Sequence, residues 1–435
     1  MIRRFSGLPG LWSTLALGSL TALTIVLNFV TQAYVLARLG AGNDTDALYL
    51  GLAVTSFFYD VVCASVSVVL MPLLVTRPDQ AGSNTWSVFQ AMGMLFAGLA
   101  TVLALAAPYW LPVLSPGFTA AGKSRAVSIT QVLLFGMVLS VLWEVLFCYH
   151  YSRGRFLWTQ SCVALTTFLS LICTIYLLPR LGILAAAWSV VVRAAVAVLL
   201  MLPGLGSYSL LRWRAPLFRE IWRGARPVML SSAYLKSDIL VERVLATFAP
   251  AGQLSLLGLS RQVIHASNRV LRESIVQPMV PELARSANAR DWLAFNRAIR
   301  NRLLLIIVLC ALATMAIVFI GRSGLALAFH GQRLTAEDIT LMWWLIILLV
   351  GAFVAEPIGK ILSNAFYSIG RSDKPSQIGV VSYSIGIGLK VIGFLVAGIK
   401  GIALAVSVYY LLHACLLYWS LRRLQQRTAD EFAVQ

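Results

Sequence analysis

One segment of the chain, residues 253–283, combines a membrane-spanning length with an unusual row of cationic and polar side chains. The row consists of Arg261, His265, Asn268, Arg269 and Arg272. Their spacing of three and four residues places them on one face of a helix, with Arg269 at its edge. Three arginines facing lipid would cost roughly 8 to 10 kcal/mol, comparable to the whole stability of a domain. The row therefore predicts a watery cavity or an anionic partner, and guanidinium groups favour phosphate.

Two other interpretations of this row stay open. The arginines could form a buried ionic network with Asp238, Glu242 and Glu273. Alternatively, Arg272 could extend its charge toward the membrane surface, as long cationic side chains do near helix ends. Lys236, on the preceding segment 227–249, completes the substrate-binding set that we predict.

Two further pairs of charges are candidates for gating or for replacing a bound ion. Glu356 and Lys360 are four residues apart in segment 337–368, the spacing at which opposite charges attract along a helix. That pair could also do no more than stabilise its helix. Lys390 is the only charged residue of segment 375–398, and Glu242 is its candidate partner.

The sequence offers no pattern typical of an enzyme. It has no glycine-rich phosphate loop ending in Lys-Ser or Lys-Thr and no His-Glu-x-x-His motif, and its four histidines lie far apart. The six cysteines occur singly within apolar segments, where they resemble small buried hydrophobic residues. We therefore expect no catalytic activity, no cofactor and no metal site.

The composition assigns the chain to the membrane. Hydrophobic residues make up 59% of the sequence and charged residues 12%, against roughly 45 to 50% and 25% in soluble domains. The apolar residues fall in runs of about 20 or more, the length that crosses a bilayer as a helix. The fold class is therefore all-α and polytopic, with about twelve transmembrane helices. The predicted spans are 11–39, 46–75, 84–113, 127–150, 156–179, 182–203, 227–249, 253–283, 302–321, 337–368, 375–398 and 400–424.

The positive charge follows the positive-inside rule and does not indicate nucleic-acid binding. The net charge is +18, and most of the 35 Lys and Arg residues fall in alternate loops, beginning with Arg3 and Arg4. This distribution predicts a multi-pass protein of the cytoplasmic (inner) membrane with both termini in the cytoplasm. The first apolar run, 11–39, is too long for a cleaved signal peptide. Residues 216–226 alternate apolar and charged positions like an interfacial helix, although an ordinary basic loop would also fit.

A weak internal repeat divides the chain into halves. Leu36–Val75 aligns with Leu245–Ala284 at an offset of about 209 residues. We therefore predict an N-terminal six-helix bundle over 1–203, a cytoplasmic amphipathic linker over 204–226 and a C-terminal six-helix bundle over 227–435. Repeats of this kind are typical of transporters that work by alternating access, although a chance match of small residues is an alternative.

Several short motifs resemble those of the MurJ/MviN lipid II flippase family, part of the multidrug/oligosaccharidyl-lipid/polysaccharide exporter superfamily. The motifs are Gly40-Ala-Gly with Thr45-Asp46-Ala47, Pro72, Ser115-Pro-Gly-Phe118, Ala328-Phe-His-Gly331, Thr335-Ala-Glu-Asp338, Phe366-Tyr-Ser368, Asp373-Lys-Pro375 and Leu417-Tyr-Trp-Ser-Leu-Arg-Arg423. Each is weak alone, but they occur in the family's order and spacing from the first helix to the twelfth.

The resemblance implies two six-helix bundles around a central cationic cavity and a polyprenyl-diphosphate-linked saccharide as cargo. It places Arg261 where the family has a cavity arginine. Ion-coupled members hold a cation between an acid on helix 7 and an Asn or Asp on helix 11, positions that correspond to Glu242 and Lys390 here. We hypothesise that the lysine ammonium takes the place of that ion.

The sequence also departs from the family pattern in its first half. Arginines of the family align with Ile25, Thr31 and the stretch 58–60, and an acid aligns with Cys63. The first interpretation is therefore a flippase for another polyprenyl-linked saccharide, such as an exopolysaccharide precursor. A lipid II flippase for peptidoglycan synthesis is the alternative, and a drug/cation antiporter of the same fold or a membrane scaffold are further ones. The expected partners are the lipid-linked saccharide and the membrane, with no nucleic acid, and we expect a monomer.

Overall fold

The structure is a computed structural model that describes residues 11–205, 208–211, 216–371 and 373–433. These residues form helices joined by short loops, with no strand in the described ranges. By length and composition, nine helical stretches of this part of the chain can cross a membrane. Arg3 and Arg4, which support the predicted cytoplasmic N-terminus, lie outside the described residues. So do 206–207 and 212–215 of the predicted linker.

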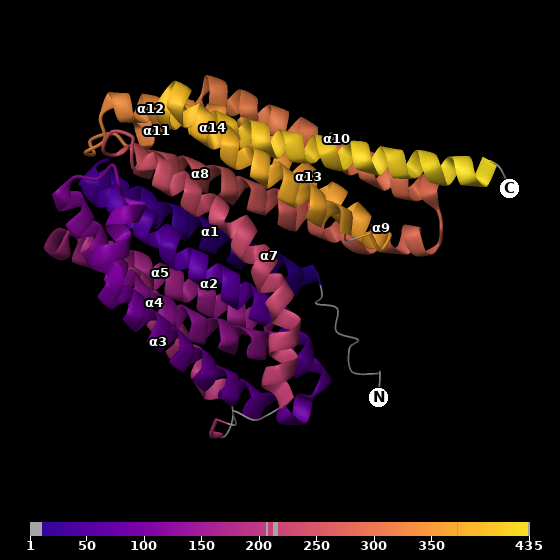
Figure 1. Cartoon of the computed structure of the whole chain (residues 1–435), viewed down its shortest axis with the longest axis horizontal. Coiled ribbons are helices and arrows are strands. Elements are labelled where there is room, and N and C mark those ends of the chain that lie inside the picture. Colours follow the sequence, from indigo (N-terminus) through magenta and orange to yellow (C-terminus); the bar gives the residue numbers. More distant parts are fainter. Residues whose placement is uncertain (1–10, 206–207, 212–215, 372, 434–435) are drawn as a thin grey trace. The chain divides into compact units, whose positions relative to one another are not determined.

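The chain divides into two compact units, Met1–Ser255 and Leu256–Gln435. The first contains α1 (Leu11–Leu39), α2 (Asn43–Thr76), α3 (Ala81–Leu114), α4 (Ala120–Ser152), α5 (Phe156–Leu181), α6 (Leu184–Met201) and α7 (Pro216–Ala246). Short turns of 3-10 helix, Pro78–Gln80 and Leu202–Leu205, join its elements. α4 is central and packs against α2, α3 and α6, while α5 contacts α1 and α6, and α7 lies along α2 (Figure 1).

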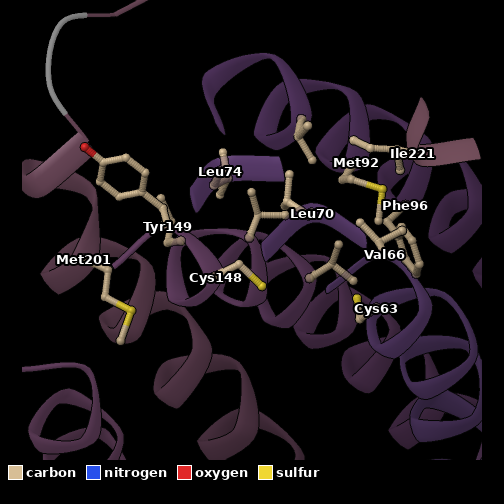
Figure 2. Close-up of a cluster of buried hydrophobic side chains, with 14 of the residues drawn as sticks. Cys63, Val66, Leu70, Leu74, Met92, Phe96, Cys148, Tyr149, Met201 and Ile221 are labelled. Atoms are coloured by element: carbon tan, nitrogen blue, oxygen red, sulfur yellow. The ribbon is translucent and has the colours of Figure 1, made fainter. Parts of the chain in front are cut away.

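The interior of the first unit is apolar where α2, α3 and α4 meet. Leu70 and Phe96 are fully buried there, and Cys148 from α4 packs into the same cluster (Figure 2). Close packing of this kind holds membrane helices together, because lipid offers helices no hydrophobic drive to associate. Four of the six cysteines are buried, as predicted. The prediction is wrong for Cys415, which is exposed.

The second unit contains the remaining helices. They are α8 (Gln253–Leu271, whose first residues belong to the first unit), a π-helical turn (Arg272–Val276), α9 (Gln277–Asn288), α10 (Trp292–Phe319), α11 (Gly321–Ala328), α12 (Ala336–Leu348), α13 (Val350–Ser368) and α14 (Asp373–Ala433). α8, the π-helical turn and α9 follow each other directly and form one predicted span, and so do α12 and α13. α14 is two helices joined at Ala397 and Gly398, where the backbone is not helical and Gly398 has φ 56°. The twelve predicted spans are therefore all present as helices.

Two helices begin earlier than the charge pattern predicts. α7 starts at Pro216 and continues through Pro227, so the predicted interfacial helix is its first part. Membrane proteins tolerate proline inside helices when other groups satisfy the freed carbonyl. α10 starts at Trp292 instead of residue 302, because the Asp291 side chain accepts a hydrogen bond from Ala294 N at 2.9 Å and caps the helix.

The two compact units do not coincide with the predicted bundles and linker. α7 and its loop to α8 pack with the first six helices, so the boundary between the units falls at residue 255 and not between 204 and 226. The predicted division into two related six-helix halves rests on the sequence repeat and not on packing, and it stays a prediction.

Two glycines on either side of the break in α14 approach each other closely, which provides a test of the packing between the two parts of α14. A Cβ atom added to Gly401 would collide with the Gly393 carbonyl, whereas a Cβ at Gly388 meets nothing within 4 Å. We expect Gly401→Ala to lower the free energy of unfolding by about 1 to 3 kcal/mol, the usual cost of overpacking. Gly388→Ala should leave stability unchanged or raise it, since alanine favours helix. Thermal unfolding of both variants in detergent checks this, and equal midpoints would contradict the close approach.

Candidate functional site

A cavity of about 410 Å³, lined by both polar and apolar side chains, lies inside the first unit. Side chains from α1, α2, α4, α5 and α6 surround it. Its polar lining consists of Asn28, Thr31, Gln32, Tyr49, Thr55, Ser56, Tyr59, Asp60, Ser140, Ser170, Ser189 and Arg193. Most of these groups are neutral hydroxyls and amides, which can both donate and accept hydrogen bonds. A cavity so lined suits a polar ligand such as a sugar or a phosphate.

Arg193 on α6 supplies the positive charge of this cavity. Its Nη1 donates to Asn28 Oδ1 at 2.9 Å, and its Nε is buried without an acceptor in the described part of the chain. No carboxylate of the described residues lies within 4 Å of the guanidinium. A charge in a membrane segment that has only a neutral partner is costly, and such residues generally serve function. The arrangement leaves Arg193 able to bind an anion.

The carboxylate that lines the cavity already has a partner. Asp60 Oδ2 on α2 accepts a hydrogen bond from Lys236 Nζ on α7 at 2.9 Å, and both side chains are partly exposed. The structure thus places Lys236, a predicted substrate-binding residue, in an ion pair with α2. Nearby, Tyr49 donates to Gln32 Oε1 at 3.0 Å. Arg193 and the Asp60–Lys236 pair together give the cavity region a net positive charge.

A second acid, Glu144, lies in the same bundle. Glu144 on α4 accepts hydrogen bonds from the hydroxyls of Tyr59 and Ser67, both at 2.9 Å and both on α2. These two bonds stabilise the carboxylate and tie α4 to α2. Glu144 therefore has a structural role in the wall behind the cavity.

The predicted row on α8 divides between two environments in the second unit. Arg261 and Asn268 are buried, Arg272 is half-buried, and His265 and Arg269 are exposed. The row thus keeps an exposed cationic edge at Arg269, while Arg272 lies 3.6 Å from its neighbour Glu273. That contact is one of those expected for the alternative ionic network.

The polar members of the row face α13. Asn268 Nδ2 donates to Glu356 Oε2 at 2.7 Å, and His265 Nδ1 lies 3.9 Å from the same oxygen. The predicted ion pair between Glu356 and Lys360 is absent from the described residues, and Lys360 is exposed. An i,i+4 pair contributes only about 0.2 to 0.5 kcal/mol, so the hydrogen bond from Asn268 on the neighbouring helix suffices to orient the carboxylate away from Lys360.

Glu242 and Lys390 are both fully buried. Their helices, α7 and the first part of α14, belong to different units. A charge removed from water and lipid alike requires compensation. Their pairing, and its proposed role in place of an ion, stays a prediction.

A buried carboxylate joins the α1–α2 turn to the start of α8. Asp46 accepts hydrogen bonds from Gly252 N at 2.6 Å and from Ser255 N at 2.7 Å, and Thr45 Oγ1 donates to Ser255 Oγ at 3.2 Å. Asp46 thereby caps a helix that lies some two hundred residues away, and its negative charge faces the positive end of the helix dipole. The Gly252 backbone is so close to Ala41 that a Cβ would not fit, and its φ is +90°.

Only some of these residues could be identified from sequence patterns. Arg193 stands out as a single charge within an apolar segment, but its neighbours Asn28 and Tyr49 come from other helices and carry no comparable signal. Asp46 belongs to a family motif, yet nothing in its spacing indicates that it caps α8. Among the predicted substrate-binding residues, the structure groups His265 and Asn268 around Glu356 and places Lys236 against Asp60.

The fold is that of exporters in the multidrug/oligosaccharidyl-lipid/polysaccharide superfamily. A solved structure described as lipid II flippase MurJ in an inward closed conformation matches 93% of this chain and 87% of its own, with a TM-score of 0.80 and 15% identity. A multidrug resistance MATE family transporter in an inward-facing conformation matches 94% of both chains, with a TM-score of 0.78 and 14% identity. At these identities the likeness concerns the fold.

The sequence comparison identifies the family. The model of the family described as "Lipid II flippase MurJ" matches residues 35–433, and the chain belongs to that family. The probable lipid II flippase MurJ of Vibrio cholerae is 21% identical over 436 residues, which cover 93% of this chain and 82% of the relative. The lipid II flippase MurJ of Burkholderia cenocepacia is 19% identical over 428 residues, covering 94% and 83%. The protein is thus a multi-pass membrane transporter of a family that handles a lipid-linked substrate.

Proposed function

We propose that the protein flips lipid II, the polyprenyl-diphosphate-linked precursor of peptidoglycan, from the cytoplasmic to the outer leaflet by alternating access. The family and its relatives support lipid II over the other saccharides that the sequence analysis put first. The structural observation that carries the proposal is Arg193 in the cavity of the first unit. It supplies a cation in the first unit, where the sequence analysis found the family's usual arginines missing.

The charges suit the chemistry of the cargo. A diphosphate carries negative charge that must leave water to cross the membrane, and guanidinium groups offer it bidentate, charge-assisted hydrogen bonds. Arg193 in the first unit, Arg261 and Arg269 on α8, and Arg272 in the π-helical turn that follows α8 provide such groups. The hydroxyls and amides around Arg193 can hydrogen-bond a sugar. We therefore assign the anionic headgroup to these arginines.

A drug/cation antiporter is less consistent with the first unit. A cationic drug would require a free carboxylate in the cavity. Asp60 is the acid in its lining, and Lys236 neutralises it at 2.9 Å. Glu144 is engaged by two hydroxyls. The net charge of the cavity favours an anion.

The proposal extends to orientation and assembly. The distribution of Lys and Arg supports cytoplasmic location of both termini in the inner membrane. A monomer suffices, since one chain contains both of the related halves that alternating access requires.

The direct test is flipping of fluorescent lipid II in proteoliposomes. We expect the wild type to flip it, and Arg261→Ala with Arg269→Ala to lower the rate at least tenfold, because each lost charge-assisted bond is worth about 1.5 to 3 kcal/mol. A control removes two exposed arginines elsewhere in the second unit, Arg297→Ala with Arg322→Ala, and should retain the rate. Flipping of another undecaprenyl-diphosphate saccharide but not of lipid II would return the cargo to the first interpretation. No flipping of either by the wild type would refute the proposed activity.

Lys390 permits a separate prediction. If its ammonium occupies the place of a coupling cation, Lys390→Ala should leave a buried negative charge that sodium can neutralise. We expect the unfolding temperature of the variant to rise with sodium chloride but not with choline chloride, and that of the wild type to respond to neither. Equal responses of variant and wild type would refute the ion-replacement hypothesis.

A further inference from the structure

A groove of about 830 Å³ crosses the outside of the second unit, apart from the polar residues described above. α13 forms its floor, where Ala355 and Leu362 are buried, and α10 and the last part of α14 form its walls. The walls present Leu304, Ile307 and Leu411, whose exposed fractions are 55%, 46% and 43%. Such a surface favours hydrocarbon over water.

Two arginines stand at one end of this groove. Arg300 of α10 and Arg422 of α14 both line it, and neither has a carboxylate within 4 Å in the described part of the chain. The nearby Arg302 differs, since it lies 3.7 Å from Glu282. Arg422 also rests over the ring of Tyr418, 5.2 Å from its centre. The groove is therefore apolar along its length and carries two uncompensated positive charges at its mouth.

The length of the groove corresponds to one leaflet of a bilayer. Leu411 and Arg422 are eleven residues apart on α14, which is about 16 Å along a helix. One leaflet contributes about half of the 30 Å hydrocarbon core. An acyl chain of a phospholipid has this reach. A polyprenyl chain of many isoprene units is longer than one leaflet is thick, so most of it would lie outside the groove.

The charged end lies where the positive-inside rule puts the cytoplasm. The loop between α9 and α10 and the end of α14 lie at the same end of the second unit (Figure 1). Both regions are rich in arginine, which predicts that they are cytoplasmic. The cytoplasmic leaflet is also the one whose anionic lipids attract such clusters.

We propose that this groove binds one anionic phospholipid of the cytoplasmic leaflet. Its phosphate lies between Arg300 and Arg422, and one acyl chain runs along α13 toward Leu411. The site is separate from the α8 arginines and from the cavity of Arg193. It does not depend on which saccharide lipid the protein transports.

Cys415 offers a local readout, because it lines the groove and is the exposed cysteine of the six. The full chain, purified in detergent, is mixed with phosphatidylglycerol or with phosphatidylcholine. The rate of Cys415 alkylation by a maleimide and the thermal unfolding midpoint are then measured. We expect phosphatidylglycerol to slow alkylation at least threefold and to raise the midpoint, and phosphatidylcholine to do neither.

Matched variants separate the site from general attraction between charges. Arg300→Gln with Arg422→Gln removes the charges at the groove, whereas Arg297→Gln with Arg423→Gln removes two arginines of the same helices that do not line it. The first variant should lose protection by phosphatidylglycerol, and the second should keep it. Protection that persists in the first variant, or is lost equally in both, would overturn the proposal. So would protection of the wild type by undecaprenyl phosphate alone, which would assign the groove to a polyprenyl lipid.

Discussion

Asp46→Ala is expected to destabilise the protein by about 2 to 6 kcal/mol. The substitution leaves the buried Gly252 and Ser255 amides without their acceptor, and each unsatisfied buried amide costs about 1 to 3 kcal/mol. It also removes a negative charge from the positive end of α8. Asp46→Asn retains one acceptor oxygen and should lose less. Denaturant unfolding of the purified protein in detergent, followed by circular dichroism, measures the difference.

Asp44 provides the control for this prediction, because it lies in the same helical turn with the same charge. Its carboxylate is exposed and lies 3.8 Å from Arg125, a contact worth little at a surface. We expect Asp44→Asn to change the free energy of unfolding by less than about 0.5 kcal/mol. If both positions gave the same small loss, the capping of α8 by Asp46 would have no energetic importance.

Arg193→Met is expected to separate transport from stability. Methionine fills much of the space of this half-buried side chain without its charge, so we expect the free energy of unfolding to change little. Transport of lipid II should fall by about ten- to a hundredfold, since a charge-assisted hydrogen bond is worth about 1.5 to 3 kcal/mol. Initial flipping rates in proteoliposomes and unfolding midpoints in detergent measure the two effects on the same preparations.

Two further variants define the role of Arg193. Arg193→Lys keeps the charge but loses the planar fork, so it should recover part of the rate. Arg180→Met makes the same exchange on α5 at an exposed arginine that lies over the Tyr176 ring, outside the cavity, and should transport normally. Normal transport by Arg193→Met would show that the cavity cation does not contact the cargo.

The spans were predictable because length and apolarity alone decide what crosses a bilayer. The first predicted span, 11–39, coincides with α1, and the others overlap their helices. The errors fall where charge was taken as the end of a helix, at the starts of α7 and α10. A helix can extend beyond the hydrocarbon core into the membrane interface, where water and headgroups solvate arginine side chains. Charged residues therefore mark the edge of the hydrocarbon core and not the end of the helix.

The contacts of the charged residues were much harder to predict from sequence patterns. Helical spacing placed Glu356 beside Lys360, but Asn268 on another helix competes for the carboxylate and prevails. Lys236 and Asp60 are 176 residues apart, and no local pattern connects them. Periodicity gives the face of a helix on which a residue lies. Which helix meets that face depends on packing throughout the bundle.

The cap on α8 also bears on the predicted repeat of two related halves. Asp46 and Ser255 are separated by 209 residues, the offset of that predicted repeat, so the two residues would be equivalent positions of the two halves. In a symmetric dimer of two identical half-length chains, Asp46 of one chain would face the equivalent aspartate of the other, and the two carboxylates would repel each other. Once the halves are fused, the two positions can differ. Asp46 then supplies the carboxylate, and Ser255 supplies the backbone amide that donates to it. Identical subunits could not form this asymmetric contact without bringing a second carboxylate close to the first.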